Sequence, residues 1–127
     1  SLQYGDGREE ELDLVRALGH TIKSMDEYAN AKDYYETAKL VKSCDLMISI
    51  CTSVVHLAGA LGVPCWVMTP KFPAWRYQNT GGMSWYKSVR LYRSPAPEQE
   101  AWRPVITRIG MDLEELVGAK QKIARVA

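Results

Sequence analysis

The 127-residue sequence lacks the features that mark membrane-spanning and polyanion-binding proteins. No apolar run approaches the roughly 20 residues that a helix needs to cross a bilayer. The formal net charge is +1, which points to neither a nucleic acid nor a membrane surface as a partner. We therefore expect no nucleic-acid partner and no membrane span.

Cysteine is also scarce and irregularly placed. The three cysteines, Cys44, Cys51 and Cys65, form an odd set without a repeated spacing, which argues against a disulfide framework. Taken with His56, their spacing matches no common pattern of zinc ligands. These features predict a reduced protein of the cytoplasmic type, with no metal site and no cofactor.

The two halves of the chain carry opposite charge. Residues 1–70 contain 6 Lys/Arg and 10 Asp/Glu, whereas residues 71–127 contain 10 and 5, which leaves the second half at +5. A binding site for an anionic ligand explains this excess, and a solvated basic surface explains it equally well.

Helical and strand-like segments alternate along the sequence. Helices are predicted at residues 8–19, 34–44, 53–62 and from 102 onward, and strands at 1–3, 20–25, 45–50, 64–68 and 89–93. The continuous apolar run at 45–50 is typical of a strand buried on both faces, whereas the alternation at 89–93 indicates a more exposed strand. Residues 70–88 are predicted to form a long loop rich in Trp and Tyr.

This alternation predicts an α/β fold in which helices cover both faces of a parallel sheet. At 14.3 kDa, residues 1–127 are expected to form a single domain.

A polar turn, Cys51-Thr52-Ser53, separates the apolar run at 45–50 from the helix that follows. In open parallel sheets, ligands bind beyond the C-terminal ends of the strands, and a helix N-terminus offers unpaired N–H groups to a phosphate. His56 lies one helical turn after Thr52, on the same side, where it can reach a phosphate or a ribose. The turn therefore favours a phosphate-ligand site.

Simpler interpretations stand beside this one. Ser and Thr at the start of a helix are more often plain caps than ligand contacts, and a single histidine in a first turn is usually an ordinary surface or core residue. The turn is not rich in glycine, so the sequence contains neither a P-loop nor a dinucleotide-binding fingerprint. No Ser-His-Asp arrangement is indicated either.

The segment DLMISICTSVVHLAGALGVPCWVMTP at 45–70 resembles part of the GT-B glycosyltransferases close to the heptosyltransferases. It is most similar to the bacterial tetratricopeptide-linked group, which is itself similar to the O-linked N-acetylglucosamine transferases. Three further segments match in order: SLQYG at 1–5, ETAKLVKSCDL at 36–46 and PAWRYQNTGGMSWYKSVRLYRSP at 73–95. The resemblance covers almost the whole chain.

This resemblance implies a Rossmann-like parallel sheet flanked by helices, as in the C-terminal half of a GT-B fold. That half binds the nucleotide-sugar donor of a glycosyltransferase that moves a hexosyl, heptosyl or N-acetylhexosaminyl group. The acceptor site, and usually the catalytic base, belong to an N-terminal domain that this chain does not match. We therefore expect the isolated chain to be incompetent in catalysis, and we assign no catalytic residue.

The resemblance also implies roles for individual residues. Thr52 and Ser53 would hold the diphosphate, and His56 would contact the phosphate or the sugar. Gln3 would lie near the nucleotide, and residues around Thr37 would border the base. The donor side of the cleft would be lined by Cys51, Trp75 and Arg76.

Two departures from the family pattern leave alternatives open. The acidic residue that precedes the Thr in the family is Cys51 here, which puts the donor contacts in doubt. The family's first strand and helix have no counterpart, so we expect strand edges that recruit a second copy into a homo-oligomer. A degenerate, noncatalytic module that serves protein interaction is an alternative, as is another GT-B enzyme such as a nucleotide-sugar epimerase.

Overall fold

The computed structural model describes residues 8–23, 25, 33–78 and 81–126. The chain divides into two compact units, residues 1–44 and residues 45–127. The strand predicted at 1–3, and Gln3 with it, lie outside the described residues.

The first unit contains helix α1, Arg8–Ala17, which ends two residues before the predicted end. Gly19 adopts a φ of +77°, and its N–H donates to the carbonyl of Arg16. The N–H of His20 reaches back to the carbonyl of Val15 at 3.1 Å. This pair of bonds is a Schellman motif, which needs a left-handed residue after the helix and so explains the glycine.

Helix α3, Tyr34–Lys42, is the second helix of this unit. The carboxylate of Asp33 accepts a hydrogen bond from the N–H of Tyr35 at 2.9 Å and so caps the helix. The prediction of a strand at 20–25 is wrong for the residues described there, which form no regular structure. A short strand is stable only when it pairs with a neighbour, and the described residues of this unit include no strand.

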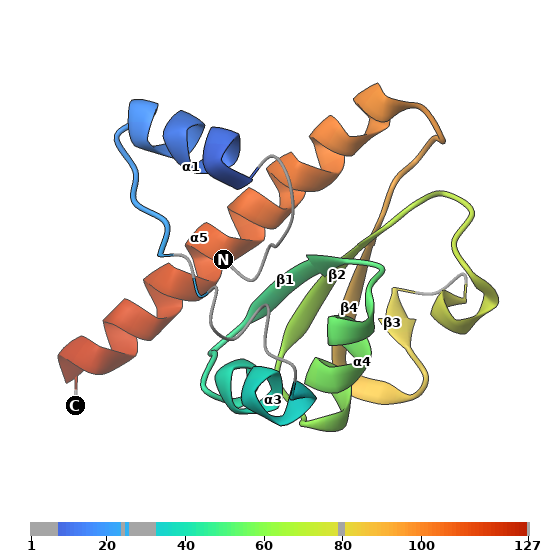
Figure 1. Cartoon of the computed structure of the whole chain (residues 1–127), viewed down its shortest axis with the longest axis horizontal. Coiled ribbons are helices and arrows are strands. Elements are labelled where there is room, and N and C mark those ends of the chain that lie inside the picture. Colours follow the sequence, from blue (N-terminus) through green and yellow to red (C-terminus); the bar gives the residue numbers. More distant parts are fainter. Residues whose placement is uncertain (1–7, 24, 26–32, 79–80, 127) are drawn as a thin grey trace. The chain divides into compact units, whose positions relative to one another are not determined.

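The second unit is built on a four-stranded sheet in the order β1-β2-β4-β3 (Figure 1). Its strands are β1 (Met47–Ile50), β2 (Cys65–Thr69), β3 (Gly82–Met83) and β4 (Tyr86–Arg93). β1, β2 and β4 are parallel, and β3 joins β4 as the antiparallel arm of a hairpin. The unit is therefore α/β with a mostly parallel sheet, as predicted.

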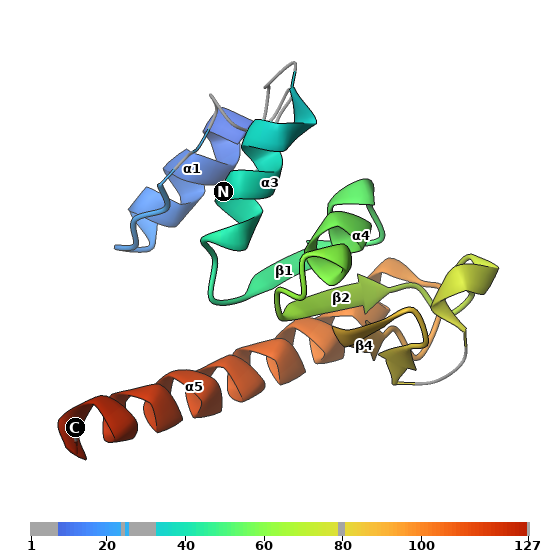
Figure 2. The ribbon, with the colours of Figure 1, turned by 90° about the horizontal axis from the view of Figure 1, so that it is seen from below.

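Two helices cover opposite faces of this sheet (Figure 2). Helix α4, Ser53–Ala60, connects β1 to β2 and packs on one face. Helix α5, Trp102–Val126, packs on the other face through Val105 and Ile109, which form a cluster with Tyr92 of β4. The alternation of side chains along each strand supplies the apolar groups for both faces.

Two of three sequence predictions in this unit need correction. β1 is an edge strand whose Ile48 and Ile50 are exposed, so it is not buried on both faces. β4 pairs with β2 on one side and β3 on the other, and it is more exposed than β2, as predicted, since Lys87 and Arg90 are exposed. The segment 70–88 is not one loop, because the 3-10 helix η1 (Trp75–Tyr77) and strand β3 form within it.

Close packing between α4 and the hairpin depends on a glycine. A methyl group added at Gly59 would lie 2.3 Å from Cγ of Tyr86, well inside van der Waals contact. Gly110, in the middle of α5, has nothing within 4 Å of the same position. The sequence therefore places one glycine where packing requires it and one where packing does not.

We expect Gly59→Ala to lower the free energy of unfolding by about 1–3 kcal/mol, because the core must shift to admit the methyl group. Gly110→Ala should instead raise it by about 1 kcal/mol, since alanine has the better helix propensity. Urea denaturation of both variants measures these changes. Equal effects of the two substitutions would contradict the packing of α4 against Tyr86.

Candidate functional site

Three parallel strands end at the same edge of the sheet, and the candidate site lies there. β1 leads into Cys51, β2 ends at Thr69, and β4 ends at Arg93. Thr69 pairs with Arg93 in the register of β2 and β4, so both side chains lie on the face that α4 covers. The thiol of Cys51 donates to the carbonyl of Met68 at 3.6 Å, which ties the turn after β1 to β2.

The start of α4 leaves backbone donors without partners. Thr52 is the N-cap residue, but its side chain makes no capping bond. Its hydroxyl lies instead 3.2 Å from the hydroxyl of Ser49. In the described part of the chain, the N–H groups of Ser53 and Val54 have no hydrogen-bond partner. Side-chain capping by the Thr52 hydroxyl is therefore absent, and these two N–H groups remain able to donate hydrogen bonds to an anion.

A buried tyrosine stands beside this turn. Tyr77, at the end of η1, is 0% exposed, and its hydroxyl has no partner of hydrogen-bonding geometry among the described residues. Burial raises the pKa of this hydroxyl, the neighbouring Cys51 raises it further, and the Arg76 guanidinium lowers it. The hydroxyl of Thr69 is likewise fully buried and unpartnered. Unpaired buried hydroxyls are costly, and such groups often belong to a ligand site.

Positive charge surrounds Cys51. Burial raises the pKa of the Cys51 thiol, while the Tyr77 hydroxyl and the guanidinium groups of Arg76 and Arg93 oppose that rise. Neither guanidinium pairs with a carboxylate within the described ranges. Arg93 donates to the carbonyls of Tyr77 and Gln78. Its charge is thus fixed near the turn, and no acidic side chain neutralises it.

We refer to these groups together as the phosphate cradle. They are the N–H groups of Ser53 and Val54, the hydroxyl of Tyr77, and the guanidinium groups of Arg76 and Arg93. Donors of this kind, collected at a helix N-terminus with unpaired positive charge, suit an anion with several oxygens.

His56 lies in an aromatic cluster next to the cradle. Its ring centroid is 6.2 Å from that of Tyr77, 6.0 Å from that of Trp85 and 5.9 Å from that of Tyr86. The ring is half-buried. The histidine is therefore packed between the cradle and the hairpin of β3 and β4.

The sequence-predicted site residues fall into two groups. Cys51, Thr52, Ser53, His56, Trp75 and Arg76 all belong to the second unit, on α4, on the turn before it, or on η1. Thr37 lies on α3 in the first unit and is half-buried.

Sequence reasoning missed Tyr77, Thr69 and Arg93 as parts of the site. Tyr77 reads as one aromatic residue among several in a loop, and nothing in the pattern shows that its hydroxyl is buried without a partner. The available signal was positional, since Thr69 and Arg93 end two of the strands whose C-terminal edge holds ligands in parallel sheets.

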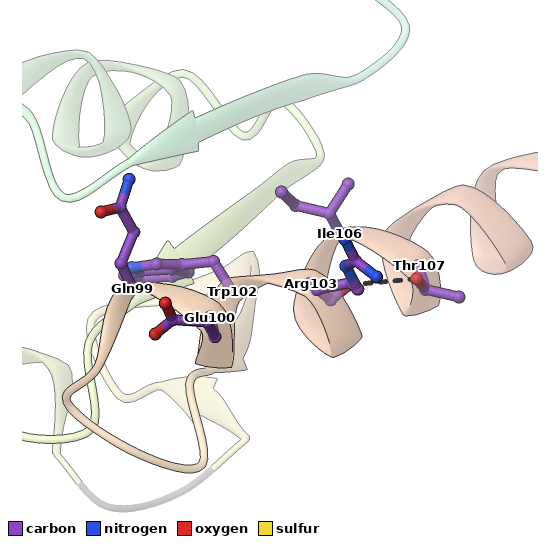
Figure 3. Close-up of a pocket in the computed structure, with 6 residues that line it drawn as sticks. All are labelled: Gln99, Glu100, Trp102, Arg103, Ile106 and Thr107. Atoms are coloured by element: carbon purple, nitrogen blue, oxygen red, sulfur yellow. Dashed lines mark hydrogen bonds between the residues drawn. The ribbon is translucent and has the colours of Figure 1, made fainter.

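An open depression lies elsewhere, between the 3-10 helix η2 (Gln99–Ala101) and the start of α5 (Figure 3). Its side chains spread apart, and the hydrogen bond drawn there, from the Thr107 hydroxyl to the Arg103 carbonyl at 3.0 Å, belongs to the helix itself. Among the described residues, no cluster of His, Cys, Asp and Glu could hold a metal ion. No helix in the described ranges is both long and apolar enough to cross a membrane.

Two tyrosines test whether the site carries an unpaired hydroxyl. We expect Tyr77→Phe to raise the free energy of unfolding by about 1 kcal/mol, because it removes a buried group without a partner. Tyr92 is the control, since its hydroxyl donates to the carboxylate of Asp112 at 2.8 Å, and that bond and burial raise its pKa to about 12. Tyr92→Phe should therefore lower the free energy of unfolding by about 2 kcal/mol. Destabilisation by Tyr77→Phe, measured in urea, would show that the Tyr77 hydroxyl is paired.

Comparison with known proteins leaves the family open. No protein-family model matches the chain, and no solved structure matches it. The chain is 29% identical over 119 residues to the protein FlbA of Caulobacter vibrioides. The match covers 94% of this chain but only 20% of FlbA, so the chain spans about a fifth of that relative.

Proposed function

We propose that the second unit binds the diphosphate of a nucleotide-sugar donor, as part of a glycosyltransferase of the GT-B type. The observation that carries the proposal is the phosphate cradle, in which unpaired N–H groups, a buried unpaired hydroxyl and two unneutralised guanidiniums surround one turn.

The chemistry of a diphosphate matches these groups. A diphosphate offers several charged oxygens, which accept hydrogen bonds from backbone N–H groups and from a hydroxyl at the same time. The N-terminal end of α4 carries partial positive charge, which favours an anion there. Ligand binding would therefore pair groups that the free protein leaves unpaired.

The strand order of the sheet also supports the proposal. The parallel set β1-β2-β4 is consistent with the last three strands of a Rossmann-like sheet, whose ligands lie beyond the strand ends. The four ordered segments that resemble the GT-B glycosyltransferases favour this family. On this proposal the acceptor site and the base belong to a facing domain, so the chain alone would not transfer sugar.

The expected affinity is low. Each charge-assisted hydrogen bond contributes about 1.5–3 kcal/mol, and the helix end contributes about 0.3–1 kcal/mol. After the costs of association, two or three such contributions fall short of the roughly 8 kcal/mol that micromolar binding requires. We therefore expect dissociation constants near the millimolar range.

Titration with UDP, ADP and GDP, followed by amide NMR, tests the proposal. We expect the amide signals of residues 51–57 to shift with each diphosphate, whereas uridine, which lacks phosphate, should leave them unchanged. Arg76→Gln should weaken UDP binding by about tenfold, because it removes a charged donor. Arg103→Gln, an exposed change on α5, is the matched control and should have no effect.

Two results would count against the proposal. Unmoved signals at residues 51–57 with all three nucleotides would favour the alternative of a noncatalytic module that serves protein interaction. Equal loss of affinity in both arginine variants would mean that binding reflects net charge and not the cradle.

A further inference from the structure

Two exposed tryptophans stand side by side near the phosphate cradle. Trp75 is 77% exposed and Trp85 is 52% exposed. Their ring centroids lie 5.6 Å apart at an interplanar angle of 72°. We refer to the two rings as the indole pair. Exposed apolar surface that is gathered in one place and rimmed by polar groups marks a binding site more often than single exposed residues do.

The indole pair is held in position from several sides. Trp75 begins η1, and Arg93 binds the carbonyls of Tyr77 and Gln78 at the other end of that short helix. Trp85 lies in the turn between β3 and β4, where its ring contacts Tyr86 at 6.5 Å. Tyr86 is itself packed against α4. A rigid surface of this kind binds a ligand with little loss of side-chain entropy.

The pair lies one side chain away from the cradle. The ring of His56 is 6.0 Å from the ring of Trp85 and 6.2 Å from the ring of Tyr77, whose hydroxyl belongs to the cradle. Arg76, the other η1 member of the cradle, directly follows Trp75. A group attached to a phosphate in the cradle can therefore reach the indole pair.

The geometry of the indole pair and the polar groups near it favour a saturated sugar ring as ligand over a flat nucleobase. At 72° the two indoles present a face and an edge, which together fit a chair-shaped ring, whereas a flat nucleobase would stack on one indole alone. Ser84, which precedes Trp85 in the chain, carries a hydroxyl that donates to the Gln78 amide oxygen at 2.8 Å. Such groups can bind sugar hydroxyls.

We propose that the indole pair binds a pyranose ring, with the C–H face of the sugar stacked on Trp75 or Trp85. This inference names the sugar portion of the ligand, and it rests on the proposed function only where that sugar is linked to a nucleotide. Removal of either indole should weaken binding of the sugar and leave binding of the diphosphate unchanged.

The NMR signals of the indole N–H groups of the four tryptophans report directly on sugar binding at the indole pair. We expect the signals of Trp75 and Trp85 to shift when methyl pyranosides are added. The methyl glycosides of glucose, N-acetylglucosamine and mannose are suitable probes. Trp66 and Trp102 pack in the cluster under α5, on the other face of the sheet, and serve as internal controls whose signals should stay in place. UDP-linked hexoses should shift the indole pair more than UDP does.

Matched variants distinguish stacking of a sugar on Trp75 from a nonspecific effect of any exposed aromatic side chain. Phe72 has the same exposed fraction as Trp75, 77%, and makes no ring contact with another aromatic residue in the described chain. Trp75→Ala should weaken pyranoside binding about fivefold, Trp75→Phe should retain most of it, and Phe72→Ala should leave it unchanged.

The outcomes distinguish this inference from the proposed function. If UDP does not bind but pyranosides still shift the indole pair, the proposed function fails and the inference stands. If neither pyranosides nor UDP-hexoses shift the pair beyond UDP, or if uridine and adenosine shift it and pyranosides do not, the inference is wrong. A fivefold loss in Phe72→Ala would also overturn it.

Discussion

Arg93 is the residue on which the arrangement of the site depends. It ends β4, and its guanidinium donates to the carbonyls of Pro70, Tyr77 and Gln78. These bonds fasten the segment after β2 to the C-terminal edge of the sheet. Because of them, η1 presents its arginine and its buried tyrosine to the same turn that begins α4. The guanidinium also keeps one positive charge there, and no carboxylate of the described residues pairs with it.

This arrangement separates the groups that stabilise the fold from those left for a ligand. In the cluster under α5 the polar groups are paired, because Asp112 accepts a hydrogen bond from Tyr92 and binds Arg90 at 2.7 Å. At the edge, the Tyr77 and Thr69 hydroxyls are buried and have no hydrogen-bond partner among the described residues. Buried hydroxyls without partners are unfavourable, and they are typical of sites where a bound molecule supplies the missing hydrogen bonds.

Much of the fold could be predicted from the sequence, because periodicity and capping residues act locally. The helices at 34–44 and 53–62 and the strand at 64–68 follow from such signals, and they appear as α3, α4 and β2. The exposure of Ile48 and the place of β4 between β2 and β3 could not, since strand order decides them and a single strand does not encode its place in a sheet. The polar turn at the site was predictable because it is a local feature of the sequence. The approach of Tyr77 to this turn was not, because it depends on the loop that Arg93 holds in place.

A crystal structure of the chain with UDP would test the central claim most directly. The account predicts that the diphosphate oxygens lie within about 3.2 Å of the Ser53 and Val54 nitrogens and of the Tyr77 hydroxyl, with Arg76 turned toward them. Well-defined UDP bound elsewhere, with the Tyr77 hydroxyl still unpartnered, would contradict it.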